Sequence, residues 1–111
     1  MTTYHYIFAS RQFMLEQEPT LEAIEERQRN YKEQEKEIDF WLVEQPAFLE
    51  NPSFKTIREK CAADKIAAII STNKQFITWM KLRLEYAYQG TFEAPSEEIA
   101  DPIASLETAS A

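Results

Sequence analysis

The sequence predicts an α+β fold: a single compact domain in which a small, mostly antiparallel sheet of three to four strands packs with helices. Segments with the apolar patterns of strands alternate along the chain with segments of helical spacing. The continuous apolar run IAAII at 66–70 is typical of a central strand covered on both faces. The proline-containing loop after the second strand can reverse the chain, which favours antiparallel neighbours, although helical crossovers leave parallel neighbours open.

The first half of the chain contains two predicted strands with a charged helix between them. Residues 3–10, TYHYIFAS, are aromatic and β-branched enough for a strand. From Thr20 the apolar side chains recur at helical spacing, and the dense charges of EERQRNYKEQEKE indicate a solvated helix face. Residues 37–43, EIDFWLV, form the second strand, in which the carboxylate Asp39 stands among residues that predict burial on both faces.

Two helices flank the central strand at 66–70. Residues 51–52, Asn-Pro, fit the N-cap and first position of a short helix. The sequence TNKQ at 72–75 matches a capping box and starts a helix predicted over 74–89. Gly90 is expected to end this helix as its C′ residue.

The last predicted helix is unusually apolar. In FITWMKLRLEYAY, residues 76–88, nine of thirteen positions are apolar or aromatic, more than one buried face requires. Either the domain buries this helix on both sides, or one side is kept for a partner. The segment 91–111 is acidic and has no Lys or Arg, so we expect an extended C-terminal tail after a folded domain at 1–90.

Composition excludes several classes of function. The net charge of −7 argues against nucleic-acid binding, which needs a basic patch. A single glycine, Gly90, excludes the glycine-rich loops that cradle nucleotide phosphates. Cys61 is the only cysteine, so an internal disulfide and a cysteine-pair zinc site are excluded. No apolar run approaches the ~20 residues that span a bilayer, and we expect no metal, no cofactor and no direct membrane insertion.

Asp39, which the two-residue period of a strand places on the same face as Trp41, has three explanations. Arg83 lies on the apolar helix between Trp79 and Tyr86 at helical spacing, where its guanidinium can stack on aromatic rings. We favour a bidentate pair between Asp39 and Arg83, which would make both charges tolerable near apolar surface. In the second explanation one or both charges stay exposed amid aromatic residues as anchors for a protein partner. A catalytic Asp39 is the weakest explanation, because no dyad partner is recognisable.

The remaining candidates have plainer explanations. His5 is the only histidine, and its place in a predicted strand indicates a structural or surface role. Cys61 lies on the apolar side of a short helix and is expected to be a small buried side chain. Aromatic residues at strand and helix spacing are more often core than the lining of a planar-ligand pocket. The residues that would line such a pocket are Tyr4, Tyr6, Trp41, Trp79, Tyr86 and Tyr88.

Three long segments carry a resemblance to a known family: EIDFWLVEQPAFL, IISTNKQFITWMKLRLEY and GTFEAPSEEIADPIASL. In them the chain resembles the small accessory protein of the aerobic magnesium-protoporphyrin IX monomethyl ester oxidative cyclase, a family of cyanobacteria and plastids. The likeness runs from TTYHYIFAS to IASL and so covers almost the whole chain. The family's partner-contact positions correspond here to Asp39, Phe40 and Arg83.

The resemblance implies a non-catalytic accessory or assembly factor in chlorophyll biosynthesis, which binds and stabilises the membrane-associated diiron catalytic subunit of the cyclase. We expect it in the cytoplasm or plastid stroma, associated with the thylakoid membrane through its partner, and a weak homodimer is left open. The alternative is a tetrapyrrole-binding carrier that presents substrate to the cyclase, and a small enzyme acting through Asp39 or His5 is a third hypothesis. The expected contact surface comprises Asp39, Phe40, Arg83, Trp41, Trp79 and Tyr86.

Overall fold

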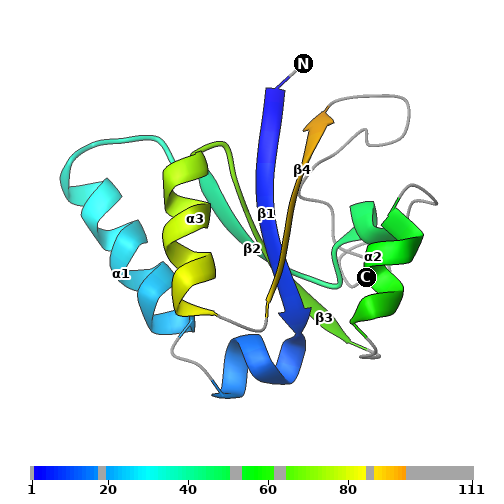
Figure 1. Ribbon diagram of the computed structural model, residues 1–111. Helices are drawn as coiled ribbons and strands as arrows, with labels where there is room; N and C mark the ends of the chain where they lie inside the picture. Colours follow the sequence, from blue (N-terminus) through cyan, green and yellow to red (C-terminus); the bar gives the residue numbers. More distant parts are fainter. Residues whose placement is uncertain (1, 18–19, 51–53, 62–64, 85–86, 95–111) are drawn as a thin grey trace.

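The structure, a computed structural model, describes residues 2–17, 20–50, 54–61, 65–84 and 87–94 (Figure 1). Helices α1 and α3 lie on one side of a central sheet, and α2 lies on the other (Figure 1). The elements follow in the order β1 (Thr2–Ser10), η1 (Phe13–Gln17, a π-helical turn), α1 (Thr20–Glu33), β2 (Phe40–Glu44), η2 (Ala47–Glu50, a 3-10 turn), α2 (Lys55–Lys60), β3 (Ile66–Ser71), α3 (Lys74–Arg83) and β4 (Tyr88–Ala94).

The sheet has four strands in the order β2-β3-β1-β4, and every neighbouring pair is antiparallel. In the register of the sheet, His5 of β1 lies between Ser71 of β3 and Thr91 of β4. Trp41 of β2 pairs with Ile70 of β3. The predicted α+β fold with a small antiparallel sheet is therefore confirmed.

Two apolar layers cover the two faces of the sheet, because successive side chains of a strand point to opposite faces. Every residue of β3 is buried, which explains why its sequence IAAIIS is continuously apolar up to the serine. The layer under α1 and α3 is built mainly from Ile7, Phe40, Ala67, Ile69, Phe76, Ile77 and Met80. The layer under α2 is built mainly from Tyr6, Phe8, Phe48, Leu49, Ile66, Ala68 and Ile70.

Strand β2 begins at Phe40, later than the predicted start of the strand at 37–43. Asp39 therefore lies just before the strand. Its backbone carbonyl oxygen accepts hydrogen bonds from the Ser71 hydroxyl at 2.8 Å and from the Thr72 backbone N–H at 3.1 Å. These two bonds hold the end of β3 against the start of β2, so the Asp39 backbone is fixed although its side chain is not part of the strand's alternation.

Helix α3 differs from its prediction at both ends. Asn73, and not Thr72, is the N-cap, because its side-chain oxygen accepts the backbone N–H of Phe76 at 3.1 Å. The helix ends at Arg83, well short of the predicted end, and Gly90 is not its C′ residue.

Gly90 instead lies inside β4, opposite Tyr6 of β1. A Cβ atom at Gly90 would stand 2.5 Å from the Tyr6 hydroxyl oxygen and 2.7 Å from its Cζ, closer than such atoms approach in proteins. The chain therefore needs a glycine here because an aromatic side chain of the next strand lies over its backbone.

The folded sheet continues to Ala94 and so includes the first residues of the segment predicted as a tail. The rest of that segment, 95–111, and the predicted helix start at 51–52 lie outside the described residues. In the part of the chain that the structure describes, no helix is long and apolar enough to cross a membrane.

Candidate functional site

Helix α3 has one buried side and one open side. Phe76, Ile77 and Met80 are buried against the sheet. On the open side the side chain of Trp79 is 46% exposed and that of Leu82 is 81% exposed. A single exposed leucine is ordinary, but Leu82 and Trp79 are three residues apart and so are neighbours on one helix face. Of the nine apolar residues counted at 76–88, four follow Arg83, where the helix ends, three are buried against the sheet, and Trp79 and Leu82 lie on this second, open side.

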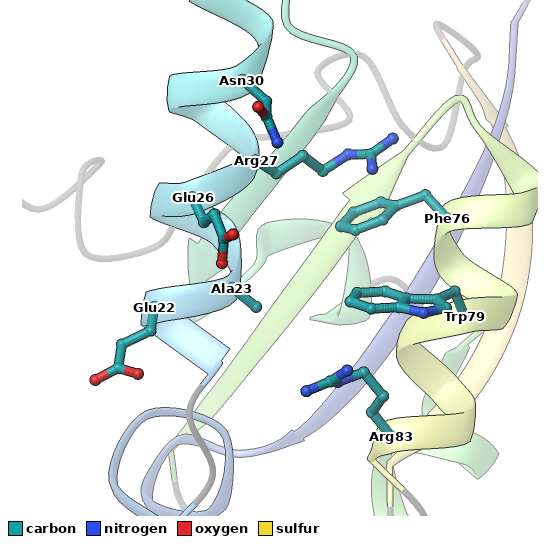
Figure 2. A pocket seen from close by; sticks show the side chains of 8 residues that line it. All are labelled: Glu22, Ala23, Glu26, Arg27, Asn30, Phe76, Trp79 and Arg83. Carbon is teal, nitrogen blue, oxygen red and sulfur yellow. The ribbon is translucent and has the colours of Figure 1, made fainter.

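Trp79 is part of a column of stacked aromatic and guanidinium groups that we call the Arg–aromatic column: Arg27, Phe76, Trp79 and Arg83. The Arg27 Cζ lies 4.0 Å from the Phe76 ring centroid, and the Arg83 Cζ lies 4.7 Å from the Trp79 ring centroid. Between them, the rings of Phe76 and Trp79 stack with centroids 6.3 Å apart and planes 24° apart. Figure 2 shows the four side chains in a row, with Arg27 reaching across from α1.

A groove of about 420 Å³ lies between α1 and α3, next to this column (Figure 2). A second hollow of about 320 Å³ shares Arg27, Phe76 and Trp79 with the groove and extends to Asn73 and Gln75. Arg27 therefore stands where the two hollows meet. The α1 wall of the groove is formed by Glu22, Ala23, Glu26, Arg27 and Asn30, and the α3 wall by Phe76, Trp79 and Arg83.

Asp39 is linked to the column through Tyr31 of α1. The Tyr31 hydroxyl accepts a hydrogen bond from Arg27 Nη2 at 2.9 Å and donates one to Asp39 Oδ1 at 3.0 Å. Burial of the phenol, followed by its hydrogen bond to Asp39, raises the pKa of Tyr31 above its usual value of 10.0. Tyr31 is therefore a neutral donor at physiological pH, and a cation and an anion on different elements share its hydroxyl group.

The favoured pairing of Asp39 with Arg83 is wrong. Asp39 binds the Tyr31 hydroxyl, and Arg83 stacks on Trp79. Among the described residues, no hydrogen bond or ion pair joins Asp39 to Arg83. Arg27 of α1 is the guanidinium that is linked to Asp39, and it is linked through Tyr31.

Phe40 is completely buried, with 0% of its side chain exposed. Its ring packs edge-on against Tyr31 at 5.2 Å and lies 5.4 Å from the Phe76 ring. The Arg27 Cζ lies 5.3 Å from the same ring. Phe40 thus supports the residues of the site from below, and it can influence a partner only through them.

The other predicted surface residues do not gather in one place. Trp41 packs in the layer on the opposite face of the sheet, where its ring centroid lies 6.3 Å from that of Tyr4. The expectation that Asp39 and Trp41 share a face is wrong, since Asp39 precedes the strand and turns toward Tyr31 on α1. Tyr86 lies outside the described residues. Of the six predicted residues, the structure brings Trp79 and Arg83 together.

Arg27 and Tyr31 were missed by the reasoning from sequence. Arg27 belongs to the charged run of α1, which was interpreted as a solvated face. The signal that could have found it is spacing: Arg27 is four residues before Tyr31, and Tyr31 belongs to the apolar stripe of the helix. An arginine at that distance from a core tyrosine can lay its guanidinium over the aromatic residues of the layer below.

The remaining candidates occupy ordinary structural positions. Cys61 is buried, as predicted, and His5 is partly buried in β1. The Tyr88 hydroxyl donates a hydrogen bond to the backbone carbonyl of Lys60 at 2.9 Å. Within the described ranges, no three His, Cys, Asp or Glu side chains gather as metal ligands would.

Comparison with known proteins identifies close relatives. The chain is 56% identical over 107 residues to a Ycf54-like protein of Synechocystis sp. PCC 6803, which covers 96% of this chain and 80% of the relative. It is 42% identical over 96 residues to the Arabidopsis thaliana protein named "Protein YCF54, chloroplastic", covering 86% of this chain and 44% of that one.

A solved structure has the same fold. The X-ray structure of the All0216 protein from Nostoc sp. PCC 7120 superposes with a TM-score of 0.91 at 63% identity, covering 95% of this chain and 96% of that one. The family profile described as "Ycf54 protein" matches residues 2–94, which includes every strand of the sheet and both walls of the groove. The chain therefore belongs to the Ycf54 protein family.

Proposed function

We propose that this chain is a non-catalytic accessory factor that binds and stabilises the diiron catalytic subunit of the oxygen-dependent magnesium-protoporphyrin IX monomethyl ester cyclase, with α3 as its contact surface. Relatives of the chain occur in cyanobacteria and in a chloroplast, in agreement with the family that its sequence segments resemble. The observation that carries the proposal is the open side of α3, where Leu82 is 81% exposed beside Trp79 and Arg83. The factor would reach the thylakoid membrane through its partner.

The open side of α3 has the composition of a binding hot spot. Trp and Arg are the residues that most often contribute large binding energies at protein interfaces. Stacking on Trp79 holds the Arg83 guanidinium in place before binding, so less side-chain entropy is lost when a partner docks. Leu82 adds apolar area that a partner would remove from water.

Stabilisation by such a factor follows from mass action. A protein that binds the folded catalytic subunit but not its unfolded form adds RT ln(1 + [L]/Kd) to the subunit's free energy of unfolding, about 2.7 kcal/mol at a free concentration 100-fold above Kd. A gain of that size changes the abundance of a marginally stable protein several-fold. No chemical step on the accessory factor is needed for this effect.

Affinity capture tests the proposal. The tagged wild type is used to capture proteins from detergent-solubilised photosynthetic membranes, beside Arg83→Ala and the control Arg29→Ala, which removes an exposed arginine of α1 outside the groove. We expect the wild type and Arg29→Ala to retain the diiron subunit, and a folded Arg83→Ala to lose most of it. If the wild type retains no cyclase subunit, the proposed function is wrong; if Arg83→Ala retains as much as the wild type, the surface is wrong.

A tetrapyrrole carrier is the second candidate function. The half-exposed Trp79 ring at the groove is suited to stacking on a planar pigment, and a volume of about 420 Å³ is within the ~300–1,000 Å³ range of small-molecule sites. Glu22 and Glu26 on the opposite wall would repel the carboxylates of such a pigment. A titration with a magnesium porphyrin tests this candidate, with tryptophan fluorescence and the Soret absorption band as the readouts. If neither shows a saturable change at micromolar pigment, the carrier function is excluded.

A further inference from the structure

We infer that the groove between α1 and α3 receives an amphipathic helix of the partner that carries two acidic residues two turns apart, one bound by Arg27 and the other by Arg83. This inference rests on the proposed function and adds the chemistry of the segment that the catalytic subunit would present. It is carried by the charge of Arg27, by the spacing of the Arg–aromatic column and by the charges of the two groove walls.

The charge of Arg27 is not neutralised directly within the described part of the chain. An arginine side chain has five N–H donors, and the hydrogen bond from Nη2 to the Tyr31 hydroxyl uses one of them. Arg27 Nε is buried and has no acceptor among the described residues. The carboxylate of Asp39 is held one hydroxyl group away. A guanidinium with unused donors next to two hollows is a site for a carboxylate.

The position of the Arg27 guanidinium is fixed before any ligand arrives. Its Cζ lies 4.0 Å from the Phe76 ring, 5.0 Å from the Tyr31 ring and 5.3 Å from the Phe40 ring. Three aromatic contacts and one hydrogen bond restrain a side chain that would otherwise sample many rotamers. Binding a carboxylate there costs little further ordering, which favours affinity.

The column sets the spacing of the two carboxylates. If the steps of 4.0, 6.3 and 4.7 Å lay in one line, the two guanidinium carbons would be about 15 Å apart, so this is the upper limit. Residues i and i+7 of a helix lie on the same face and about 10.5 Å apart along its axis. This separation is within that limit, so we assign the two acidic residues to i and i+7, and an apolar residue at i+3 or i+4 would then lie over Trp79.

The other wall of the groove favours a polypeptide over a small anion. Glu22 and Glu26 are exposed carboxylates on α1, across the groove from the column (Figure 2). A helix can place acidic residues toward the Arg–aromatic column and basic residues toward Glu22 and Glu26, and so complement both sides of the groove. A small ligand with carboxylates alone would be attracted by Arg27 and Arg83 and repelled by Glu22 and Glu26.

Peptides of the catalytic subunit test this inference. Overlapping 20-residue peptides that cover the diiron subunit are titrated with the wild-type chain, Arg27→Gln, Arg83→Gln and the matched control Arg29→Gln. We expect the wild type to bind peptides with acidic residues at i and i+7, and Arg27→Gln to raise their Kd roughly 10- to 100-fold, the loss of a charged hydrogen bond. Replacing the acidic residue that Arg27 binds with Gln should raise the Kd of the peptide for the wild type by the same factor. Arg27→Gln should then bind this altered peptide no more weakly than the wild type does.

A melting curve of each variant separates binding from folding. If Arg27→Gln is less stable than the wild type, the peptide titrations are repeated with Arg27→Lys. This variant keeps the positive charge but lacks the planar fork of the guanidinium. The inference is overturned if no peptide binds, if the bound peptides lack the acidic pair, or if neither Arg27 variant changes their Kd. It is also overturned if a magnesium porphyrin binds saturably and depends on Arg27.

Capture of the whole catalytic subunit distinguishes this failure from failure of the proposed function. If the wild type and both Arg27 variants retain the subunit equally, the accessory role stands and the groove inference falls. If the wild type retains no cyclase subunit, both fall.

Discussion

Replacing Tyr31 with Phe removes one hydroxyl group and leaves a ring of nearly the same shape. In the wild type this hydroxyl accepts from Arg27 at 2.9 Å and donates to Asp39 at 3.0 Å. The change removes the hydrogen-bond partner that the Arg27 guanidinium and the Asp39 carboxylate, both partly buried, share among the described residues. Because both groups are partly exposed and can regain water, we expect a loss of about 1–2 kcal/mol in the free energy of unfolding, the lower part of the range for unsatisfied polar groups.

Thermal and urea unfolding at pH 7 measure this loss. In a domain of this size about 1 kcal/mol corresponds to roughly 4 °C in Tm, so Tyr31→Phe should melt about 4–8 °C below the wild type. Tyr4→Phe is a matched control, since it removes the hydroxyl of a partly buried tyrosine on the other face of the sheet. Equal melting temperatures for Tyr31→Phe and the wild type would show that the hydroxyl does not hold the two charges together.

The same variant makes a prediction about alkaline pH. The pKa of Tyr31 is raised by burial and by its bond to Asp39, so its contribution to stability is complete below the unfolded value of 10.0 and is lost as pH rises through the folded value. The pKa of Tyr6 is also raised by burial, and its contribution remains in both proteins. Unfolding curves from pH 8 to pH 11 should therefore show a smaller loss of stability in Tyr31→Phe than in the wild type. An equal or larger loss of stability in Tyr31→Phe would contradict a raised pKa of Tyr31 in the folded protein.

Two further substitutions test the core below the site and the close approach at β4. Gly90→Ala places a Cβ atom 2.5 Å from the Tyr6 hydroxyl, so the ring must move. We expect urea unfolding to show a loss of about 1–3 kcal/mol in the free energy of unfolding. The control Gln89→Ala changes an exposed side chain of the same strand and should alter that free energy by no more than ~0.5 kcal/mol. Equal midpoints for the two variants would refute the close approach. Phe40→Ala should cost about 3–5 kcal/mol because the ring is completely buried, while Phe40→Leu should cost less and keep partner capture. Loss of capture in a stably folded Phe40→Leu would contradict this expectation and mean that the site above needs the aromatic ring itself.

The sheet was largely predictable because its strongest signals are local. The run at 66–70 is apolar at consecutive positions, which suits a strand buried on both faces, and β3 is indeed buried throughout. The aromatic and β-branched segment at 3–10 matches β1 within a residue. These strands needed no knowledge of their neighbours.

The end of α3 could not be predicted in this way. Residues 84–88 continue an apolar pattern that suits a helix, and Gly90 is a usual helix terminator. The end of the helix is set by the pairing of β4 with β1, which joins residues 80 to 92 positions apart in sequence. Gly90 is explained by Tyr6, a residue that no local pattern connects with it.

The site was predicted in part. Trp79 and Arg83 stack on each other because they are four residues apart on one helix, which is visible in the sequence. The partner of Asp39 was not visible, since the position of α1 over the sheet decides which arginine comes near it. The four-residue spacing from Tyr31 indicates Arg27 within the charged run, but it does not show that Asp39 binds the same hydroxyl group.

The central claim is that the open side of α3 binds the catalytic subunit, and two matched substitutions test it directly. Leu82→Gln and Ile38→Gln each replace an exposed aliphatic side chain. Leu82 is 81% exposed and lies on α3, whereas Ile38 is 41% exposed and lies just before β2. We would measure the Kd of each folded variant for the purified diiron subunit by biolayer interferometry. The account predicts that Leu82→Gln weakens binding roughly tenfold or more and that Ile38→Gln binds like the wild type. If Ile38→Gln loses binding and Leu82→Gln keeps it, the contact surface is at the start of β2 and the claim is wrong.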